Sequence, residues 1–325
     1  MTADPAGPER NDWHLDPEIA ALLPALNTGF PAVETMTGAE ARAAVRARYR
    51  PPQQPQPIGA VENRVIPGDV PVRIYWPASP SGGAVAGREQ PIVVFAHGGG
   101  FVFCDLNTHD DLCRSLSNGV GAVVISVDYR LAPESRWPAA AEDTYTALCW
   151  AAASAAGLGG DASRIVVAGD SAGGNLATVT ALLARDRSGP AIAGQVLLYP
   201  VIAADFDTQS YREFATGYYN TRAAMAWYWD QYIPDATDRS HPHAAPRHAA
   251  LAGLPPAVVV TAGFDPLRSE GDAYAEALAA EAVPVAHRCY QGAIHGFMTM
   301  PVLKLAGAAT RQVCDDIRAM LASDG

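Results

Sequence analysis

A serine in a glycine-rich turn is the residue of this sequence best suited to covalent chemistry. Ser171 stands in GDSAGG, after the apolar run RIVVA (164–168) and before an alanine-rich stretch of helical length (172–186). A serine on a sharp turn between a strand and a helix is exposed, and the free N–H groups of the helix face it. The pattern Gly-x-Ser-x-Gly in this setting favours a nucleophile over a serine that only caps the helix.

A serine hydroxyl needs a base to take its proton and an acid to orient that base. Asp265 follows the apolar run VVVTAGF (258–264), and His295 lies in the glycine-flanked loop GAIHGF. Alone, Asp265 could start a turn and His295 could be a packed loop histidine. Together they complete the chain order Ser, Asp, His, which favours a catalytic triad. Asp170 precedes the serine, and we expect it to shape the turn.

Three consecutive glycines, 98–100, follow His97 at the end of the apolar run PIVVFA (91–96). Glycine loses the most backbone freedom on folding, so such a run is costly. Taken alone it would be a flexible loop. With a triad elsewhere in the chain, we expect the loop to turn its N–H groups toward the reacting oxygen, and His97 to hold it by hydrogen bonds.

Another histidine cluster resembles a metal site. His241, His243 and His248 stand in SHPHAAPRH, but Pro242 and Pro246 stiffen the segment and no cysteine or acidic ligand is close by. We therefore expect no metal there.

The elements around these motifs indicate an α/β fold. The segment 70–77 alternates like an antiparallel edge strand, whereas several continuous β-branched runs are typical of strands buried on both faces of a parallel sheet. These runs span 91–97, 121–130, 164–171, 194–200 and 256–265. Helical stretches at 139–156 and 172–186 lie between them, which predicts an open, mostly parallel sheet.

Two regions depart from this alternation. Helical patterns over 15–26 and 39–49 precede the proline-rich connector PPQQPQP, and the aromatic segment 203–240 is too long for an ordinary connection. We expect them to form a lid over the carboxyl ends of the strands. Residues 1–57 are predicted to form the N-terminal helical part of a cap with its linker. The predicted catalytic domain consists of residues 58–202 and 241–325, and residues 203–240 form a second cap segment.

The composition limits the partners. The net charge of −11 argues against nucleic acid and anionic membrane surfaces as partners. The sequence contains no run of 18 apolar residues, so membrane insertion is not expected. The N-terminus lacks the pattern of a signal peptide. The five cysteines are scattered and form no Cys-x-x-Cys pair, so neither a disulfide framework nor a zinc site is expected and a cytoplasmic location is the default.

Several motifs together resemble the hormone-sensitive-lipase-like family of bacterial carboxylesterases. The resemblance runs from about residue 60 to the end, and its motifs are HGGGF (97–101), DYRLAPESRWPAAAED (128–143), GDSAGG (169–174), DPLRSEG (265–271) and HGF (295–297). It implies an α/β-hydrolase fold with an eight-stranded sheet and a helical cap, no cofactor, a small-molecule ester substrate and a homodimer paired through the last strand and helix.

The resemblance also implies a mechanism. It implies hydrolysis of short- to medium-chain acyl esters through an acyl-enzyme intermediate. The implied catalytic residues are Ser171, Asp265 and His295, and the implied oxyanion donors are the N–H groups of Gly99, Gly100 and Ala172. An amidase, deacetylase or lactonase would use the same triad. A non-catalytic binding protein is less favoured, because the related gibberellin receptors of plants lack the histidine that His295 provides.

Further residues carry structural expectations. We expect Arg130, Glu134, Glu142 and Asp143 to form one charge-paired network beneath the glycine loop. Cys104 and Asn220 stand where the family often has glycine and leucine, and either could alter the pocket. The rings of the aromatic cap segment are expected either to line an acyl pocket or to pack between cap and body; they are Tyr218, Tyr219, Trp227, Tyr228, Trp229 and Tyr232. The candidate pocket residues are Phe101, Tyr199, Tyr218, Tyr219 and Trp227.

Overall fold

The computed structural model describes residues 13–52, 54–78 and 89–322. Residues 1–12 and 53, which belong to the predicted N-terminal part and its linker, lie outside the described residues.

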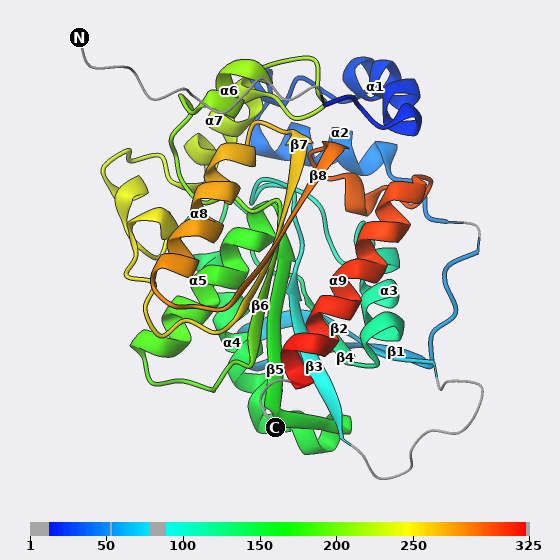
Figure 1. The fold of residues 1–325 in the computed structure, drawn as a ribbon, viewed down its shortest axis with the longest axis vertical. Helices are drawn as coiled ribbons and strands as arrows, with labels where there is room; N and C mark the ends of the chain where they lie inside the picture. Colours follow the sequence, from blue (N-terminus) through cyan, green and yellow to red (C-terminus); the bar gives the residue numbers. More distant parts are fainter. Residues whose placement is uncertain (1–12, 53, 79–88, 323–325) are drawn as a thin grey trace.

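The described strands form one mostly parallel sheet of eight strands, as the sequence predicted (Figure 1). The sheet order is β1-β2-β4-β3-β5-β6-β7-β8, in which β2 pairs antiparallel with both β1 and β4 and all other pairs are parallel. The edge strand β1 was not predicted, because its side chains are mostly exposed and form no apolar run. The strands are β1 (Ala60–Ile66), β2 (Val70–Trp76), β3 (Gln90–Ala96), β4 (Val123–Val127), β5 (Gly160–Asp170), β6 (Gly194–Leu198), β7 (Ala257–Phe264) and β8 (Val285–Ile294).

Helices cover both faces of the sheet, so the alternating side chains of a strand enter two different cores. In β3, Val94 packs in the core beneath α4, α5 and α8, whereas Val93 and Phe95 pack in the core beneath α3 and α9. This explains why the central strands are apolar throughout. The helices are α1 (Pro17–Gly29), α2 (Gly38–Arg48), α3 (Asp110–Val120), α4 (Ala139–Ser154), α5 (Ala172–Asp186), α6 (Gln209–Glu213), α7 (Arg222–Tyr232), α8 (Arg268–Ala280) and α9 (Lys304–Ala322).

None of the helices in the described part of the chain combines the length and apolar character that a membrane span requires.

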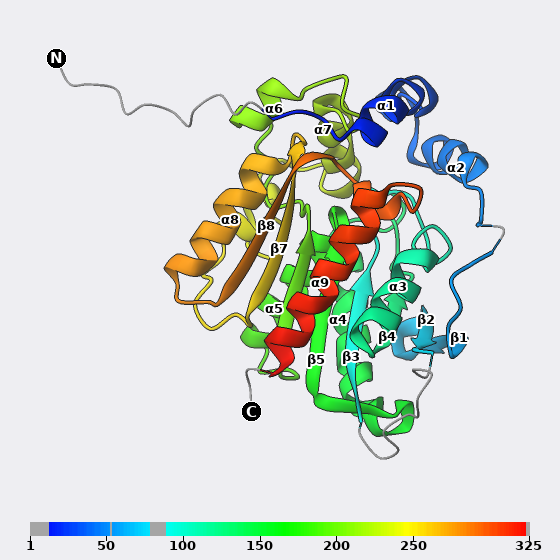
Figure 2. The ribbon, with the colours of Figure 1, turned by 45° about the vertical axis from the view of Figure 1, so that its right-hand side comes forward.

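The N-terminal helices and the segment with α6 and α7 lie at the upper end of the molecule, with α6 and α7 above β7 and β8 (Figure 2). Asn27 joins them, since its Nδ2 donates to the Gly217 carbonyl at 2.8 Å and its Oδ1 accepts from the Tyr219 N–H at 2.9 Å. Arg42 of α2 reaches the body of the fold and donates to the Val102 carbonyl at 2.9 Å. We call these two segments, 13–52 and 203–240, the roof. The division of the chain into cap and catalytic domains stays a prediction.

Helix α5 crosses very close to the end of β3. A Cβ atom placed on Gly173 would lie 1.9 Å from the carbonyl oxygen of Ala96 and 2.6 Å from that of His97. Both obstacles are main-chain atoms of the sheet, which cannot rotate away. Only glycine lets the first turn of α5 approach the sheet so closely, and this approach fixes where the residue before the helix lies.

Substitution of Gly173 tests the close approach of α5 to β3. Gly173→Ala should destabilise the protein by about 3 kcal/mol or more, because the added methyl group must displace the backbone of β3 or of α5. Urea unfolding would measure the loss. Gly157→Ala is the matched control, since a Cβ there meets nothing within 4 Å, and we expect it to change stability by less than about 0.5 kcal/mol. Equal stability of the two variants would contradict the steric account.

A carboxyl group is buried where α8 meets the chain that follows β6. The Glu270 side chain is 2% exposed and its Oε1 accepts from the Ile202 N–H at 2.9 Å, while its Oε2 has no hydrogen-bond partner among the described residues. Burial raises the pKa of Glu270 well above its usual value, and the nearby Asp265 adds to the increase. The folded protein therefore holds this carboxyl protonated at pH values at which the unfolded chain ionises it.

The buried carboxyl of Glu270 predicts a pH dependence of the stability of the protein. Between the pKa of an unfolded-chain glutamate, about 4.3, and the raised pKa of the folded state, the folded protein binds up to one more proton than the unfolded chain, so Glu270 lowers stability as the pH rises through this range. Glu270→Gln cannot ionise, and its free energy of unfolding should increase relative to that of the wild type between pH 5 and pH 8. Urea unfolding at both pH values measures this. Glu276→Gln, on the exposed side of the same helix, should show little such trend. The prediction would be refuted if the free energy of unfolding of the wild type increased relative to that of Glu270→Gln as the pH rises.

Candidate active site

Ser171 occupies a strained turn between β5 and α5. Its backbone angles are φ 54° and ψ −117°, a conformation that few residues other than glycine adopt. The turn is held because the Ser171 N–H donates to the Leu198 carbonyl at 2.8 Å and because α5, which begins at the next residue, crosses close to the end of β3. The side chain thus projects from the carboxyl end of the central strand.

The structure brings Asp265 and His295 to the same place. Asp265 directly follows β7, and His295 directly follows β8, so both stand at the carboxyl edge of the parallel strands. The Nδ1 atom of His295 lies 2.7 Å from Asp265 Oδ2, and its Nε2 atom lies 2.9 Å from Ser171 Oγ. The three predicted residues therefore form one continuous chain of hydrogen bonds.

The carboxylate of Asp265 is held in one orientation. Its side chain is completely buried, and its second oxygen accepts from the Leu267 N–H at 2.9 Å. A carboxylate next to His295 Nδ1 favours the tautomer in which that nitrogen carries the proton. Nε2 then has a lone pair directed at the serine hydroxyl, which is the arrangement a general base requires.

The glycine loop after β3 adopts angles that suit glycine. Gly99 and Gly100 have φ values of 107° and 59°, and a Cβ on Gly100 would lie 2.4 Å from the ring of Tyr228. The Gly99 carbonyl accepts from the N–H groups of Val102 and Phe103 at 3.0 and 3.1 Å, so the loop is a closed turn. At Gly100 a side chain would thus meet Tyr228 as well as an unfavourable backbone angle.

Three N–H groups near Ser171 remain free. Within the described part of the chain, the backbone nitrogens of Gly99, Gly100 and Ala172 donate to no protein acceptor. Gly99 and Gly100 line the same cavity as Ser171, and Ala172 begins α5. Unpaired donors beside a nucleophile are available to a negatively charged oxygen.

Asp170 links the serine turn to the glycine loop. Its Oδ1 accepts from the Gly98 N–H at 2.8 Å and lies 3.0 Å from His109 Nε2. Burial opposes ionisation of this carboxyl, but His109, His97 and the Gly98 N–H together hold its pKa below the usual value. His109 was missed by the sequence analysis, because a histidine at the start of a polar helix carries no recognisable pattern.

His97 supports the loop from below, as expected. Its Nδ1 lies 2.7 Å from the Gly98 carbonyl oxygen, and its ring stacks on Tyr129 with centroids 4.3 Å apart. Burial and the neighbouring His109 lower the pKa of His97 to about 4. The imidazole is therefore neutral near pH 7 and acts as a structural group.

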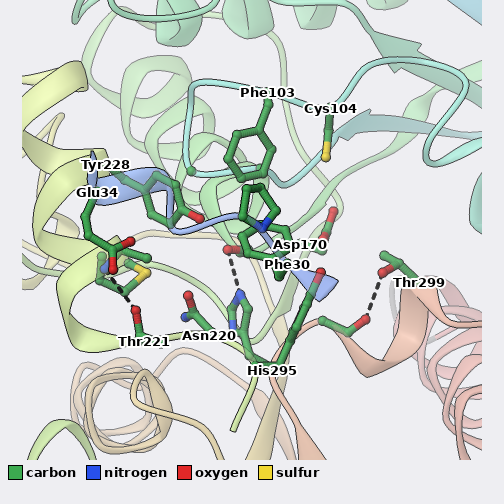
Figure 3. A pocket seen from close by; sticks show the side chains of 18 of the residues that line it. Phe30, Glu34, Phe103, Cys104, Asp170, Asn220, Thr221, Tyr228, His295 and Thr299 are labelled. Carbon is green, nitrogen blue, oxygen red and sulfur yellow. Dashed lines mark hydrogen bonds between the residues drawn. The ribbon is translucent and has the colours of Figure 1, made fainter. Parts of the chain in front are cut away.

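A cavity of about 300 Å³ opens beside Ser171 and His295 (Figure 3). Its walls come from the glycine loop and from both segments of the roof. The aromatic residues that line it are Phe30, Phe103, Tyr219 and Tyr228, and its polar residues beyond the triad include Asn27, Glu34, Asn220 and Thr221.

The predicted pocket lining needs correction, because only Tyr219 of the five rings lines this cavity. Phe101 stacks on Tyr232 at 3.8 Å between centroids, Tyr199 lies edge-on behind His295 at 5.1 Å, Tyr218 stacks on Phe264 at 5.5 Å, and Trp227 packs next to Tyr228 at 5.5 Å. Aromatic side chains occur all around α7, so the sequence could not indicate which of them face the cavity. Tyr228 was named only within the aromatic cap segment as a whole. Phe30 and Phe103 lie outside α7, and no local pattern marked them as cavity residues.

The predicted charge network is also corrected. The structure contains three separate ion pairs in place of one network. Arg130 binds Asp143 with the shortest N–O distance at 2.7 Å, Glu134 binds Arg42 of the roof at 2.8 Å, and Glu142 binds Arg187 of α5 at 2.6 Å. Two of the cations come from distant parts of the chain, which the local motif could not reveal.

The histidine segment 241–248 forms ordinary contacts. His243 Nε2 lies 2.8 Å from Asp186 Oδ2, and the His243 N–H donates to His241 Nδ1 at 3.1 Å. Among the described residues, no group of three or more histidine, cysteine or acidic side chains is placed to hold a metal ion.

Known proteins resemble the chain over most of its length. A family model described as the α/β-hydrolase fold matches residues 93–299. Carboxylesterase NlhH of Mycobacterium tuberculosis is 40% identical over 303 residues, which cover 90% of this chain and 92% of that protein.

Solved structures agree with this. A thermostable esterase from Pseudomonas putida has a TM-score of 0.87 at 37% identity, covering 97% of this chain and 99% of its own. A hyperthermophilic esterase from the archaeon Pyrobaculum calidifontis has a TM-score of 0.85 at 40% identity, covering 94% and 99%. The chain therefore belongs to the hormone-sensitive-lipase-like carboxylesterases of the α/β-hydrolase fold, a family of carboxylic ester hydrolases.

Proposed function

We propose that the chain is a serine carboxylesterase that hydrolyses short- to medium-chain acyl esters through an acyl-enzyme intermediate. The observation that carries the proposal is the chain of hydrogen bonds from Asp265 through His295 to Ser171, with distances of 2.7 and 2.9 Å, at the wall of a cavity. This geometry supplies a nucleophile, its base and the group that orients the base.

In the first step, Ser171 Oγ attacks the ester carbonyl carbon and His295 Nε2 takes the hydroxyl proton. The carbonyl oxygen becomes an oxyanion, which accepts from the free N–H groups of Gly99, Gly100 and Ala172. Asp265 stabilises the imidazolium without itself taking a proton.

In the second half, His295 gives its proton to the departing alcohol oxygen, and the acyl group remains on Ser171. Water then enters, loses a proton to His295 and attacks the acyl carbon. The bond from the acyl carbon to Oγ breaks, Oγ regains a proton from His295, and the carboxylic acid leaves. Each proton taken by the imidazole is returned within the cycle, so the proposed chemistry requires no cofactor.

Two further expectations stay predictions, a cytoplasmic location and a homodimer paired through β8 and α9. The sheet order places β8 at one edge, and such a strand presents unpaired N–H and C=O groups to a second copy.

Substitution of the nucleophile tests the mechanism. Ser171→Ala should lower turnover of p-nitrophenyl butyrate by roughly 10⁶-fold, because it removes the hydroxyl that lies 2.9 Å from His295 Nε2. Circular dichroism should show an intact fold. Ser163→Ala, at the exposed start of β5, is the matched control and should retain the wild-type rate. A Ser171→Ala protein that kept a tenth of the activity would rule the mechanism out.

The size of the cavity predicts a limit on the acyl chain. A volume of about 300 Å³ is small for a ligand pocket, and the rings of Phe30, Phe103 and Tyr228 bound it. We expect kcat/KM to be highest for p-nitrophenyl esters between acetyl and octanoyl and to fall by at least about tenfold at palmitoyl. A palmitoyl optimum would contradict this, and faster turnover of p-nitrobutyranilide than of p-nitrophenyl butyrate would favour the amidase alternative.

A further inference from the structure

Four aromatic rings form a connected wall of the proposed substrate cavity. Phe30 meets Tyr219 and Phe103 edge-on, with ring centroids 5.2 and 6.1 Å apart. Phe103 meets Tyr228 in the same way at 5.5 Å, and none of these pairs is stacked. The face of an aromatic ring carries partial negative charge, which attracts a cation. The wall can thus hold apolar groups and, on ring faces that stacking has not covered, a positive charge.

A carboxylate stands beside this aromatic wall. Glu34 lines the cavity and is exposed, and Figure 3 shows its side chain next to Tyr228. Burial raises the pKa of the Tyr228 phenol well above its usual value, and the negative charge of Glu34 adds to the increase, so the two groups interact. Among the described residues, Glu34 forms no ion pair that would neutralise its charge. The carboxylate therefore acts on a ligand in the cavity.

The rest of the cavity wall offers little positive charge. Within the described part of the chain no lysine or arginine lines it, whereas Asp170 adds a second carboxylate. The basic side chains that do line it are His109 and His295, and His295 is neutral when it acts as a base. Burial raises the pKa of Tyr219 to about 12, and Arg48 offsets part of that increase without itself lining the cavity. The charge complementary to this cavity is therefore positive.

The aromatic wall adjoins the proposed oxyanion donors. A Cβ atom placed on Gly100 would lie 2.4 Å from the ring of Tyr228, so that ring packs directly against the glycine loop. When the carbonyl oxygen of an ester accepts from the Gly100 N–H, a substituent a few bonds away can reach Tyr228 and Glu34. We therefore expect a charged group on a short acyl chain or a short alcohol to meet both the rings and the carboxylate.

From this arrangement we infer that the cavity favours esters that carry a quaternary ammonium group, and that Glu34 is the specificity-determining residue. The inference rests on the proposed esterase function and names a substrate class for it. Such a group presents methyl groups to the aromatic wall, while its charge is attracted by the ring faces and by the carboxylate.

Isosteric pairs of esters test this, each replacing the charged nitrogen by a carbon atom. On the alcohol side the pair is butyrylcholine with 3,3-dimethylbutyl butyrate. On the acyl side it is the p-nitrophenyl esters of 4-(trimethylammonio)butyrate and 5,5-dimethylhexanoate. For each pair the ratio of kcat/KM, cationic over neutral, is compared between the wild type and Glu34→Gln, so that the intrinsic reactivity of the esters cancels.

We expect Glu34→Gln to lower this ratio about three- to tenfold for at least one pair, the size of one partly screened ion pair. Glu276→Gln is the matched control, because it makes the same change in net charge on an exposed part of α8 that does not line the cavity. It should keep the ratio. Raising the NaCl concentration from about 20 mM to about 500 mM should lower the ratio of the wild type more than that of Glu34→Gln.

The aromatic wall has its own variant. Phe30→Leu keeps an apolar side chain but removes a ring, and should lower the ratio about two- to fivefold for the pair that responds to Glu34→Gln. Met225→Leu, an apolar change elsewhere in the cavity lining, should keep the ratio whatever happens to the absolute rates.

Ratios that Glu34→Gln leaves unchanged for both pairs would overturn the inference, and so would an equal fall in Glu276→Gln or a wild type that cleaves neither cationic ester. Hydrolysis of p-nitrophenyl butyrate by the wild type separates this failure from failure of the proposed function. With that activity present and Ser171-dependent, constant ratios reject only the preference for ammonium esters, whereas its absence rejects esterase function itself.

Discussion

The hydrogen bond from the Gly98 N–H to Asp170 is the contact on which the site geometry depends. It joins the end of β3 to the end of β5, and it spans the short distance between the glycine loop and Ser171. His109 Nε2 lies 3.0 Å from the same carboxylate oxygen, so the position of Asp170 is fixed by two elements besides its own. Nucleophile and free N–H donors are thereby fixed relative to each other before any substrate arrives, which is the preorganisation that electrostatic stabilisation requires.

The features predictable from the sequence are those with a strong local signal. Continuous β-branched runs are rare outside buried strands, so the central sheet was predicted with nearly correct boundaries. The triad residues each follow such a run, and the carboxyl ends of parallel strands meet at one edge. Chain order and strand position were therefore enough to bring Ser171, Asp265 and His295 together.

The features that could not be predicted depend on contacts between distant parts of the chain. The partner of Glu134 is Arg42, which lies 92 positions earlier in the roof. The rings of α7 are buried on several sides, and only the packing of the roof against the glycine loop decides that Tyr228 faces the cavity and Trp227 does not. His109 acquires its role from Asp170, a partner on another strand.

The roof has a consequence for how such a protein can diversify. The proposed chemistry lies entirely at the ends of the sheet, whereas much of the remaining cavity wall comes from two excursions of the chain, 13–52 and 203–240. Side chains such as Asn27 and Arg42 hold these excursions in place without touching the triad. Recognition and reactivity thus occupy separate stretches of sequence. Mutation libraries confined to the roof would explore new selectivities against a constant catalytic background, and natural lineages have the same route open to them.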